Sequence, residues 1–284
     1  MSKPAAMWLR LRNVPRLRAL RLEEALFRAD RRSWFITSEW DKPEGGDAAA
    51  TAAAHERAQS VVLGISGKTE ELVHTDLAAA AGVPLIKRFS GGGTVICDAD
   101  TFFVTFIAAA EALPEVKPYP EPILAWTADV YGDALRSCGV EDFRVNANDY
   151  CLGDVKFGGN AQSISGKRWL HHTSLLWDYQ PERMAMLKQP AKQPAYRENR
   201  PHGSFVQGLH ASAIGSRSEI LNAIVSAASE RLELSEVSLE EAEHATTLPH
   251  RRVTCLVHGE GGAWNAARDV HAAKGMGNKP EFGC

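Results

Sequence analysis

The hydrophobic positions of this chain follow the helical period in some segments and the strand period in others, which predicts a mixed fold. After Val14-Pro15, leucines and Phe27 recur at helical spacing, so residues 16–30 are predicted to form a helix that starts at a proline. Ser216-x-x-Glu219 is a capping box and predicts the start of another helix. Further helices are predicted over 69–81 with Gly82 as the C-cap, 123–138, 220–234, and a shorter one after Ser238-x-x-Glu241.

Short apolar runs bounded by turn residues predict the strands. Residues 61–65 form one such run, and residues 85–106 read as strand, glycine turn, strand, short loop, strand. Residues 143–177 predict an antiparallel meander with hairpin turns at Gly153-Asp154 and Gly166-Lys167. The fold class expected from this mixture is α+β, with a sheet flanked by helices.

Three segments carry no clear period. Residues 41–58 combine Pro, Gly and an Ala/Thr run and are predicted to be a flexible surface insertion. Residues 188–202 are rich in Pro, Lys and Arg and predict an irregular loop, and residues 246–284 are predicted to be poorly ordered. We therefore expect a main domain over 1–210 and a helical, partly irregular C-terminal extension over 211–284.

Composition narrows the function classes. A chain of 284 residues with 44% hydrophobic residues can bury one large core, or one core and a small appendage. With a net charge of −3 and a pI of about 6.4, no global basic field predicts a nucleic-acid partner. No apolar stretch approaches the length of a membrane span. We expect a monomer that binds neither nucleic acid nor membrane.

Two features bear on localisation. Five cysteines without close pairs favour a reducing, intracellular compartment over a disulfide scaffold. Residues 1–22 hold five arginines and one lysine but no acid, as mitochondrial presequences often do. The same residues also fit the structural helix, which we favour. Mitochondrion and cytoplasm both stay open.

The first candidate for chemistry is the glycine run after Arg88. Gly91, Gly92 and Gly93 can present bare backbone N–H groups as a nest for an anion or a carbonyl oxygen. Arg88 would add a planar fork for phosphate or carboxylate. A β-turn beside a surface arginine explains these residues equally well.

The second candidate is the meander. Lys156 follows a hairpin turn and precedes two glycines, so it could reach a bound carbonyl or phosphate, although an exposed hairpin lysine is the ordinary alternative. Asn148-Asp149 could hold Mg²⁺, and an Asx turn is the alternative. His171 and His172 must point to opposite faces of a strand, so they cannot form a paired metal site.

Together these segments resemble the lipoate–protein ligase family of the biotin/lipoyl ligase and transferase superfamily. The resemblance covers residues 83–180 most strongly, and Leu22-Glu-Glu resembles the first helix of the family. It is carried by four motifs in order: Arg88-Phe-Ser-Gly-Gly-Gly-Thr-Val95, Asn148-Asp149, Lys156-Phe-Gly-Gly-Asn-Ala-Gln162 and Leu170-His-His-Thr-Ser-Leu-Leu176.

The resemblance implies a catalytic domain of the biotin/lipoyl ligase type, with ligand between the glycine loop and the lysine hairpin. It implies ATP, Mg²⁺ and lipoate or octanoate as ligands, and Lys156 as the catalytic residue. The acceptors would be lipoyl domains of 2-oxoacid dehydrogenases or the glycine cleavage carrier protein. Nucleotide contacts would come from Arg88, Gly93, Thr94, Val95, Ile96 and Lys156. The acyl site would hold Ser90, Gly91, Gly92, Lys156, Gly159, His172 and Thr173.

The chain also departs from the family pattern. The family usually has His-Asp-x-Gly-Asn after the glycines, and this chain has Cys97-Asp-Ala-Asp-Thr101. Residues 211–284 look too irregular for a full accessory domain. We therefore keep two alternatives to an ATP-dependent ligase. One is an ATP-independent transferase with Cys138 or Cys151 as nucleophile. The other is a binding module without turnover.

Overall fold

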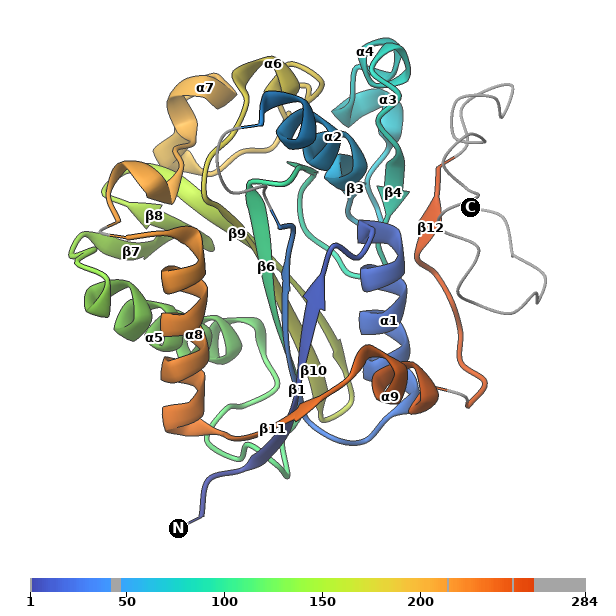
Figure 1. Cartoon of the computed structure of the whole chain (residues 1–284), viewed down its shortest axis with the longest axis vertical. Coiled ribbons are helices and arrows are strands. Elements are labelled where there is room, and N and C mark those ends of the chain that lie inside the picture. Colours follow the sequence, from blue (N-terminus) through green and yellow to red (C-terminus); the bar gives the residue numbers. More distant parts are fainter. Residues whose placement is uncertain (1, 42–46, 214, 247, 258–284) are drawn as a thin grey trace.

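The structure is a computed structural model that describes residues 2–41, 47–213, 215–246 and 248–257. Within them, two sheets are flanked by helices (Figure 1). The larger sheet has the strand order β11 (Glu233–Val237), β1 (Ala5–Arg12), β2 (Trp34–Glu39), β6 (Thr101–Ala109), β10 (Arg168–Leu176), β9 (Val155–Ser165), β8 (Asp149–Leu152) and β7 (Phe143–Asn146). The smaller sheet has the order β12 (Cys255–Leu256), β4 (Leu85–Lys87), β3 (Ser60–Leu63) and β5 (Val95–Cys97).

The helices complete the layers. They are α1 (Arg16–Ala29), α2 (Ala48–Ala58), α3 (Thr69–Leu72), α4 (Thr75–Ala80), α5 (Pro120–Ser137), α6 (Pro181–Met184), α7 (His202–Phe205), α8 (Arg217–Arg231) and α9 (Leu239–His244). Short 3₁₀ turns η1 (Ala195–Arg197) and η2 (Leu209–Ala211) lie between α6 and α8. In the larger sheet β1 pairs in parallel with β2 and β11, and the other ladders are antiparallel. The predicted α+β fold with a mixed sheet is confirmed.

Strand β6 shows how the sequence divides the two faces of the larger sheet. Phe102, Val104 and Phe106 belong to the core under α5 and α8, whereas Ile107 belongs to the core under α1 and α9. Figure 1 shows these helix pairs on either side of the sheet. Successive side chains of a strand alternate between faces, so Phe103 and Thr105 face the α1 side. The functional residues described below lie on that side.

Four element predictions are corrected. Residues 48–58 are not a flexible surface insertion, because Asp47 caps α2 and the helix buries Ala54, His55 and Ala58; residues 42–46 lie outside the described residues. The single helix over 69–81 is two short helices, interrupted where Val73 forms a β-bridge with Leu187. The helix predicted over 220–234 starts at Arg217 and ends at Arg231, and Glu233–Val237 forms β11 instead. The prediction for 246–284 is wrong at β12, and residues 258–284 lie outside the described part.

Other element predictions hold. Helix α1 begins after Pro15, and residues 5–12 pair within the sheet, so the arginine-rich N-terminal segment is part of the fold. The meander over 143–177 is present as β7 to β10, with turns at both predicted positions. Helix α9 follows a complete capping box at Ser238 and Glu241. Among the described residues, no helix combines the length and apolarity needed to cross a membrane.

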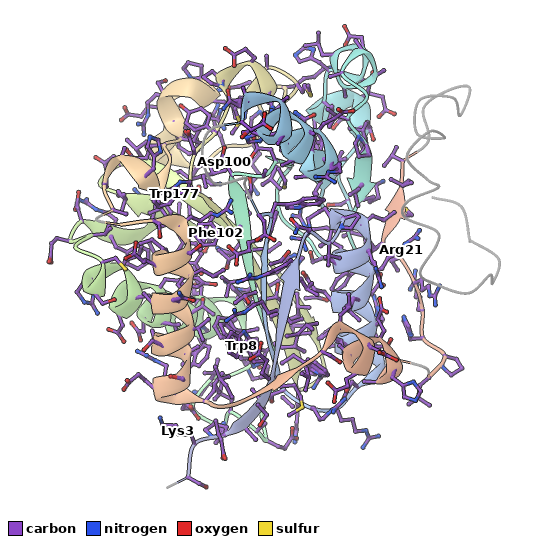
Figure 2. The ribbon with its side chains drawn as sticks, in the orientation of Figure 1. Lys3, Trp8, Arg21, Asp100, Phe102 and Trp177 are labelled. Atoms are coloured by element: carbon purple, nitrogen blue, oxygen red, sulfur yellow. The ribbon has the colours of Figure 1, made fainter. Side chains whose placement is uncertain are left out.

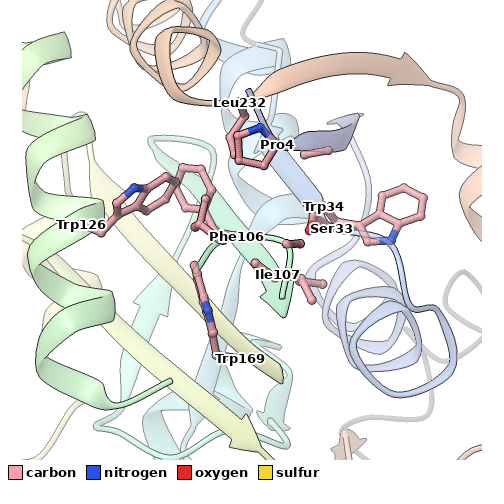
Figure 3. A pocket seen from close by; sticks show the side chains of 12 residues that line it. Pro4, Ser33, Trp34, Phe106, Ile107, Trp126, Trp169 and Leu232 are labelled. Carbon is pink, nitrogen blue, oxygen red and sulfur yellow. The ribbon is translucent and has the colours of Figure 1, made fainter. Parts of the chain in front are cut away.

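A backbone hydrogen bond lies at one end of the larger sheet, and packed aromatic rings lie deeper in the core. At one end, the Trp177 backbone N–H donates to the Asp100 carbonyl over 2.9 Å, and both residues are labelled at that end in Figure 2. Deeper in the core, the rings of Phe106 and Trp126 meet edge to face, and Trp169 packs against Trp126 (Figure 3). They border an apolar cavity of about 10 Å³, which has room for one water molecule at most. This hollow is a packing defect and lies apart from the polar site.

Candidate functional site

A cavity of about 610 Å³, called the main cavity from here, lies on the α1 side of the larger sheet. Its walls come from α1, β5, the β8–β9 hairpin, β10, the loop over 187–197 and α7. Of the predicted site residues it collects Arg88, Gly93, Thr94, Val95, Ile96, Asn148, Asp149, Lys156, Gly159, His172 and Thr173. Ser90, Gly91 and Gly92 are not among the described residues that line it. The sequence motifs therefore converge on one cavity, although they are far apart along the chain.

Lys156 is held at one end of the main cavity by an acid. Its Nζ lies 2.6 Å from Oδ1 of Asp149, and the hydroxyl of Tyr196 donates to Oδ2 of the same carboxylate over 2.7 Å. The Lys156 side chain is 24% exposed, so it is not the freely solvated hairpin lysine of the ordinary alternative. A Cβ built on Gly159 would lie 3.2 Å from Nζ. The glycine therefore leaves space for the ammonium group to lie over β9.

Asn148 and Asp149 belong to the tight turn between β7 and β8. Ala147 and Asn148 both have positive φ, at 48° and 78°, as a two-residue hairpin turn requires. The Asn148 carbonyl accepts from Asn160 Nδ2 over 2.6 Å. Each oxygen of Asp149 makes one contact, to Lys156 Nζ and to the Tyr196 hydroxyl. The Mg²⁺ role of Asn148 and Asp149 stays a prediction.

Arg88 holds the glycine loop in place through hydrogen bonds. Its Nη2 donates to the carbonyls of Gly91 (2.6 Å) and Gly93 (2.9 Å), and its Nε donates to Ser90 Oγ (3.0 Å). The guanidinium is buried, and burial lowers its pKa to about 10. These donors are directed into the loop, so Arg88 fixes the loop conformation rather than presenting a free fork to a ligand.

A buried chain of hydrogen bonds runs from Ser90 to helix α1. Ser90 Oγ lies 2.7 Å from His172 Nε2, and His172 Nδ1 lies 2.9 Å from Glu23 Oε2. Since the carboxylate can only accept, Nδ1 carries the proton, and in the neutral ring Nε2 accepts from the Ser90 hydroxyl. Burial lowers the pKa of His172 despite the bond to Glu23, which keeps the ring neutral. Glu23 was not predicted as a site residue, although it belongs to the Leu22-Glu-Glu stretch that resembles the first helix of the family.

Three residues of the cavity lining carry buried polar atoms without partners among the described residues, and Gln193 is one of them through its Oε1. The Oγ1 of Thr94 has no hydrogen bond, and neither do Nε and Nη1 of Arg16 at the start of α1. Leaving a buried donor unpaired costs about 1–3 kcal/mol, which a ligand that supplies acceptors would recover. Arg16 and Tyr196 were also missed by the sequence predictions, because only tertiary packing brings them to the cavity.

The main cavity is strongly cationic. Its acidic lining residues are Glu23 and Asp149, whereas its cationic ones are Arg16, Arg88, Lys156, Lys188, Lys192 and Arg197. The effect is visible at His202, whose pKa falls to about 4 through burial and through the nearby charges of Arg197 and Lys156. A cavity with this charge excess is suited to a polyanionic ligand.

Side chains on the opposite face of the sheet serve the core. His171 Nε2 lies 2.9 Å from the Tyr150 hydroxyl, and Gln162 Nε2 donates to His171 Nδ1 over 3.1 Å. The Thr173 hydroxyl accepts from Tyr131 of α5 over 2.9 Å, so the predicted acyl-site role can involve only its backbone. The two histidines face opposite sides of β10 as expected, and His172 is the one at the cavity.

The thiols of the described free cysteines lie outside the cavity lining. Cys97 is buried, and burial raises its pKa to about 12. Cys151 is buried on β8, its thiol donates to Tyr196 Oη over 3.5 Å, and burial raises its pKa as well. Cys138 lies at the end of α5. Reactive cysteines need a lowered pKa and access, and Cys97 and Cys151 have neither.

The altered loop after β5 is tied to its surroundings by charges. His55 of α2 lies 3.6 Å from an Asp98 oxygen and 3.3 Å from an Asp100 oxygen, and Arg183 of α6 forms an ion pair with Asp98. Arg183 Nη1 also lies 2.9 Å from His55 Nδ1. The buried acids thus join α2 and α6 to the segment that follows Ile96.

Comparison with known proteins gives one family. The model of the lipoyl protein ligase A/B catalytic domain matches residues 17–222. A Plasmodium falciparum protein named inactive lipoate–protein ligase 2 is 30% identical over 52% of this chain and 47% of its own length. A lipoate–protein ligase of Bacillus subtilis is 28% identical over 42% of this chain and 34% of its own. The chain thus spans less than half the length of these two relatives.

Solved structures share the fold. A putative lipoate protein ligase from T. acidophilum with bound lipoic acid has a TM-score of 0.65 at 17% identity, covering 85% of this chain and 93% of that one. A lipoate–protein ligase A bound with ATP has a TM-score of 0.64 at 18% identity, covering 86% and 93%. At these identities the likeness establishes the fold, and function has to be argued from the site.

Proposed function

We propose that this chain, which belongs to the lipoyl protein ligase A/B catalytic-domain family, is an ATP-dependent lipoate–protein ligase. The observation that carries the proposal is the main cavity itself, which joins Lys156, the glycine loop and a large excess of cationic side chains. ATP is a polyanion and an acyl-adenylate carries one negative phosphate, and a cationic cavity with an unpaired Thr94 hydroxyl supplies positive charge and a hydrogen-bond donor for both. None of the described lining residues is a cysteine, which disfavours a thioester route.

The first step would activate the acid. A carboxylate oxygen of lipoate or octanoate attacks the α-phosphorus of ATP, the bond to the β-phosphate oxygen breaks, and pyrophosphate leaves. Lys156 would then exchange its contact with Asp149 for the phosphate and acyl oxygens of the adenylate. Preorganised donors of this kind supply the usual largest part of catalysis. Mg²⁺ would be expected to arrive with the nucleotide phosphates, and the Asp149 oxygen that Lys156 releases could serve as one of its ligands.

The second step would transfer the acyl group. The neutral amine of an acceptor lysine attacks the acyl carbonyl, the acyl–phosphate bond breaks, AMP leaves, and the amine loses a proton to give the amide. Lys156 would stabilise the charge that develops on the carbonyl oxygen. The acceptors would be lipoyl domains of 2-oxoacid dehydrogenases or the glycine cleavage carrier protein. One solved archaeal relative is described as a bipartite ligase with its E2 lipoyl domain.

The test is an intact-mass assay with purified protein, an apo lipoyl domain and lipoate. We expect the acceptor to gain one lipoyl group only when Mg-ATP is added, with AMP formed in equal amount. Modification from an acyl-carrier thioester without ATP would instead establish the transferase alternative. Supplying synthetic lipoyl-AMP separates the two steps. Transfer from lipoyl-AMP alone would show that adenylation is lacking and that the ligase proposal holds for the second step only.

A second candidate is a module that binds lipoate without turnover. The Cys97–Thr101 loop favours it, because ion pairs to His55 and Arg183 occupy the acids of that loop. Binding of lipoate, with no acyl transfer from lipoyl-AMP or from an acyl-carrier thioester, would establish this candidate and exclude the ligase.

A further inference from the structure

Arg16 is an unusual residue to find at the wall of the main cavity. It stands in the first turn of α1, where the helix dipole disfavours a cation. Its side chain is only 4% exposed, and its guanidinium carbon lies 3.8 Å from the centre of the Phe103 ring. Its one polar contact is Nη2 to Glu23 Oε1 at 3.5 Å, a long contact to a carboxylate that also binds His172. Nε and Nη1 have no partner among the described residues.

The sheet register places Arg16 far from Lys156. Phe103 on β6 pairs with Ser174 on β10, and Ser174 pairs with Gly159 on β9. Lys156 Nζ lies over Gly159, and Arg16 lies over Phe103. Two strand spacings separate these positions, about 10 Å. An acyl chain whose carbonyl is held at Lys156 and which crosses β10 would end beside Arg16.

We propose that Arg16 is a specificity-determining residue that selects acyl tails carrying acceptor atoms at the far end, as the two dithiolane sulfurs of lipoate do, over plain alkyl tails such as octanoate. This inference rests on the proposed function, because it assumes that an acyl acid occupies the main cavity. Sulfur is a weak, polarizable acceptor, so it can approach the unpaired N–H groups of Arg16. An alkyl tail offers no acceptor, so it leaves the same groups unsatisfied.

The expected preference for lipoate over octanoate follows from the number of unpaired N–H groups on Arg16. Satisfying one buried donor that is unpaired in the free protein strengthens binding about tenfold, so the wild-type protein should bind lipoate about tenfold more tightly than octanoate. Arg16→Met replaces the guanidinium by an unbranched apolar chain. It should tighten octanoate, weaken lipoate, and bring the ratio of the two dissociation constants near one. Arg16→Lys should fall between, because an ammonium group offers fewer positioned donors.

The experiment is calorimetric titration of the full chain with lipoate and with octanoate, without ATP. Arg18→Met is the matched control, since Arg18 lies on the same helix but pairs with Glu243 outside the cavity. Thermal denaturation of each variant checks that it is folded. A ratio that Arg16→Met and Arg16→Lys both leave at the wild-type value would overturn the inference.

The outcomes also separate this inference from the proposed function. If both acids bind and the ratio collapses in Arg16→Met, the inference stands even where no ATP-dependent transfer is found. If transfer occurs but the ratio is unchanged, the ligase proposal stands and the role of Arg16 is refuted. If neither acid binds to the wild-type protein, both proposals fall.

Discussion

The Lys156 ammonium group lies 2.6 Å from a carboxylate oxygen of Asp149, and Asp149 is itself fixed by the Tyr196 hydroxyl. The lysine side chain is thereby positioned at the cavity wall before any ligand binds. Preorganised charge of this kind needs little reorganisation when negative charge develops on a substrate. The contact also explains why the turn over 147–149 and the loop that carries Tyr196 lie together.

The first prediction concerns Lys156. Lys156→Ala should lower acyl transfer by about 10²–10³, the loss typical for one oxyanion donor, while the melting temperature changes little. Lys167→Ala is the control, because Lys167 occupies the next hairpin and pairs only with the exposed Glu111. Steady-state transfer to an apo lipoyl domain gives both rates. Equal activity of the two variants would remove Lys156 from the mechanism.

The second prediction concerns the thiols. Cys138→Ser and Cys151→Ser should keep most of the ATP-dependent transfer, because the acyl group would travel as a phosphate anhydride. Intact-mass analysis should find no hydroxylamine-labile acyl group on the protein. Cys97→Ser should raise the apparent KM for ATP without any trapped adduct, since Cys97 directly follows the predicted nucleotide segment. A thioester trapped on Cys138 or Cys151 would favour the transferase alternative instead.

The third prediction is a pH dependence of stability. Burial, and the nearby His172, lower the pKa of His171 to about 3. The unfolded chain titrates near 6.5, so between these values it binds a proton that the folded protein rejects. The free energy of unfolding should therefore fall as pH decreases from about 6.5, by up to about 1.4 kcal/mol per pH unit.

The comparison that isolates this effect is His171→Gln, which cannot titrate. Urea denaturation at several pH values between 7 and 4 should give a shallower slope for the variant than for the wild-type protein. Identical slopes would mean that other groups cause the acid sensitivity.

The fourth prediction concerns the charges around the altered loop. Burial raises the pKa of Asp98, but bonds to His55, to the Asp100 backbone and to Arg183 outweigh it and leave the pKa below its usual value. Arg183→Met should cost about 3 kcal/mol of unfolding free energy, because it leaves a buried acid uncompensated. Glu182→Gln, an exposed neighbour, should be nearly neutral.

A double variant sharpens this test. Adding Asp98→Asn to Arg183→Met removes the uncompensated charge and should recover part of the loss. Chemical denaturation at pH 7 gives the unfolding free energy of the wild-type protein, the two single variants Arg183→Met and Asp98→Asn, and the double variant, which together form a thermodynamic cycle. Additive losses would show that the two residues do not interact.

The sequence was informative where local patterns decide the structure. The apolar stripe of α1, the glycines after Arg88 and the two-residue turns of the meander each impose their own conformation. The elements that were missed depend on distant partners. Val73 breaks the predicted helix because it bridges to Leu187, and β11 forms only because β1 offers it an edge.

The same distinction applies to the site. Lys156 and Gly93 could be singled out from the sequence because their motifs carry the candidate chemistry within a few residues, and both line the main cavity. Arg16, Glu23 and Tyr196 come from separate segments and meet only through tertiary packing. The nucleotide contact predicted for Arg88 stays a prediction, and the sequence did not indicate that its Nη2 donates to the carbonyls of Gly91 and Gly93.

The parallel pairing of β1 with β11 has a consequence for folding on the ribosome. Ala5 to Leu9 pair with Glu233 to Val237. The outer edge of the first strand therefore stays unpaired until more than two hundred further residues have been synthesised. Contacts of such sequence separation slow folding, and an unpaired edge exposes a nascent chain to aggregation. Pairing of β1 with the nearby β2 can form early, but the larger sheet is complete only after β11 has left the exit tunnel. Synthesis rate and chaperone supply should therefore decide the yield of soluble protein more than the stability of the finished fold does.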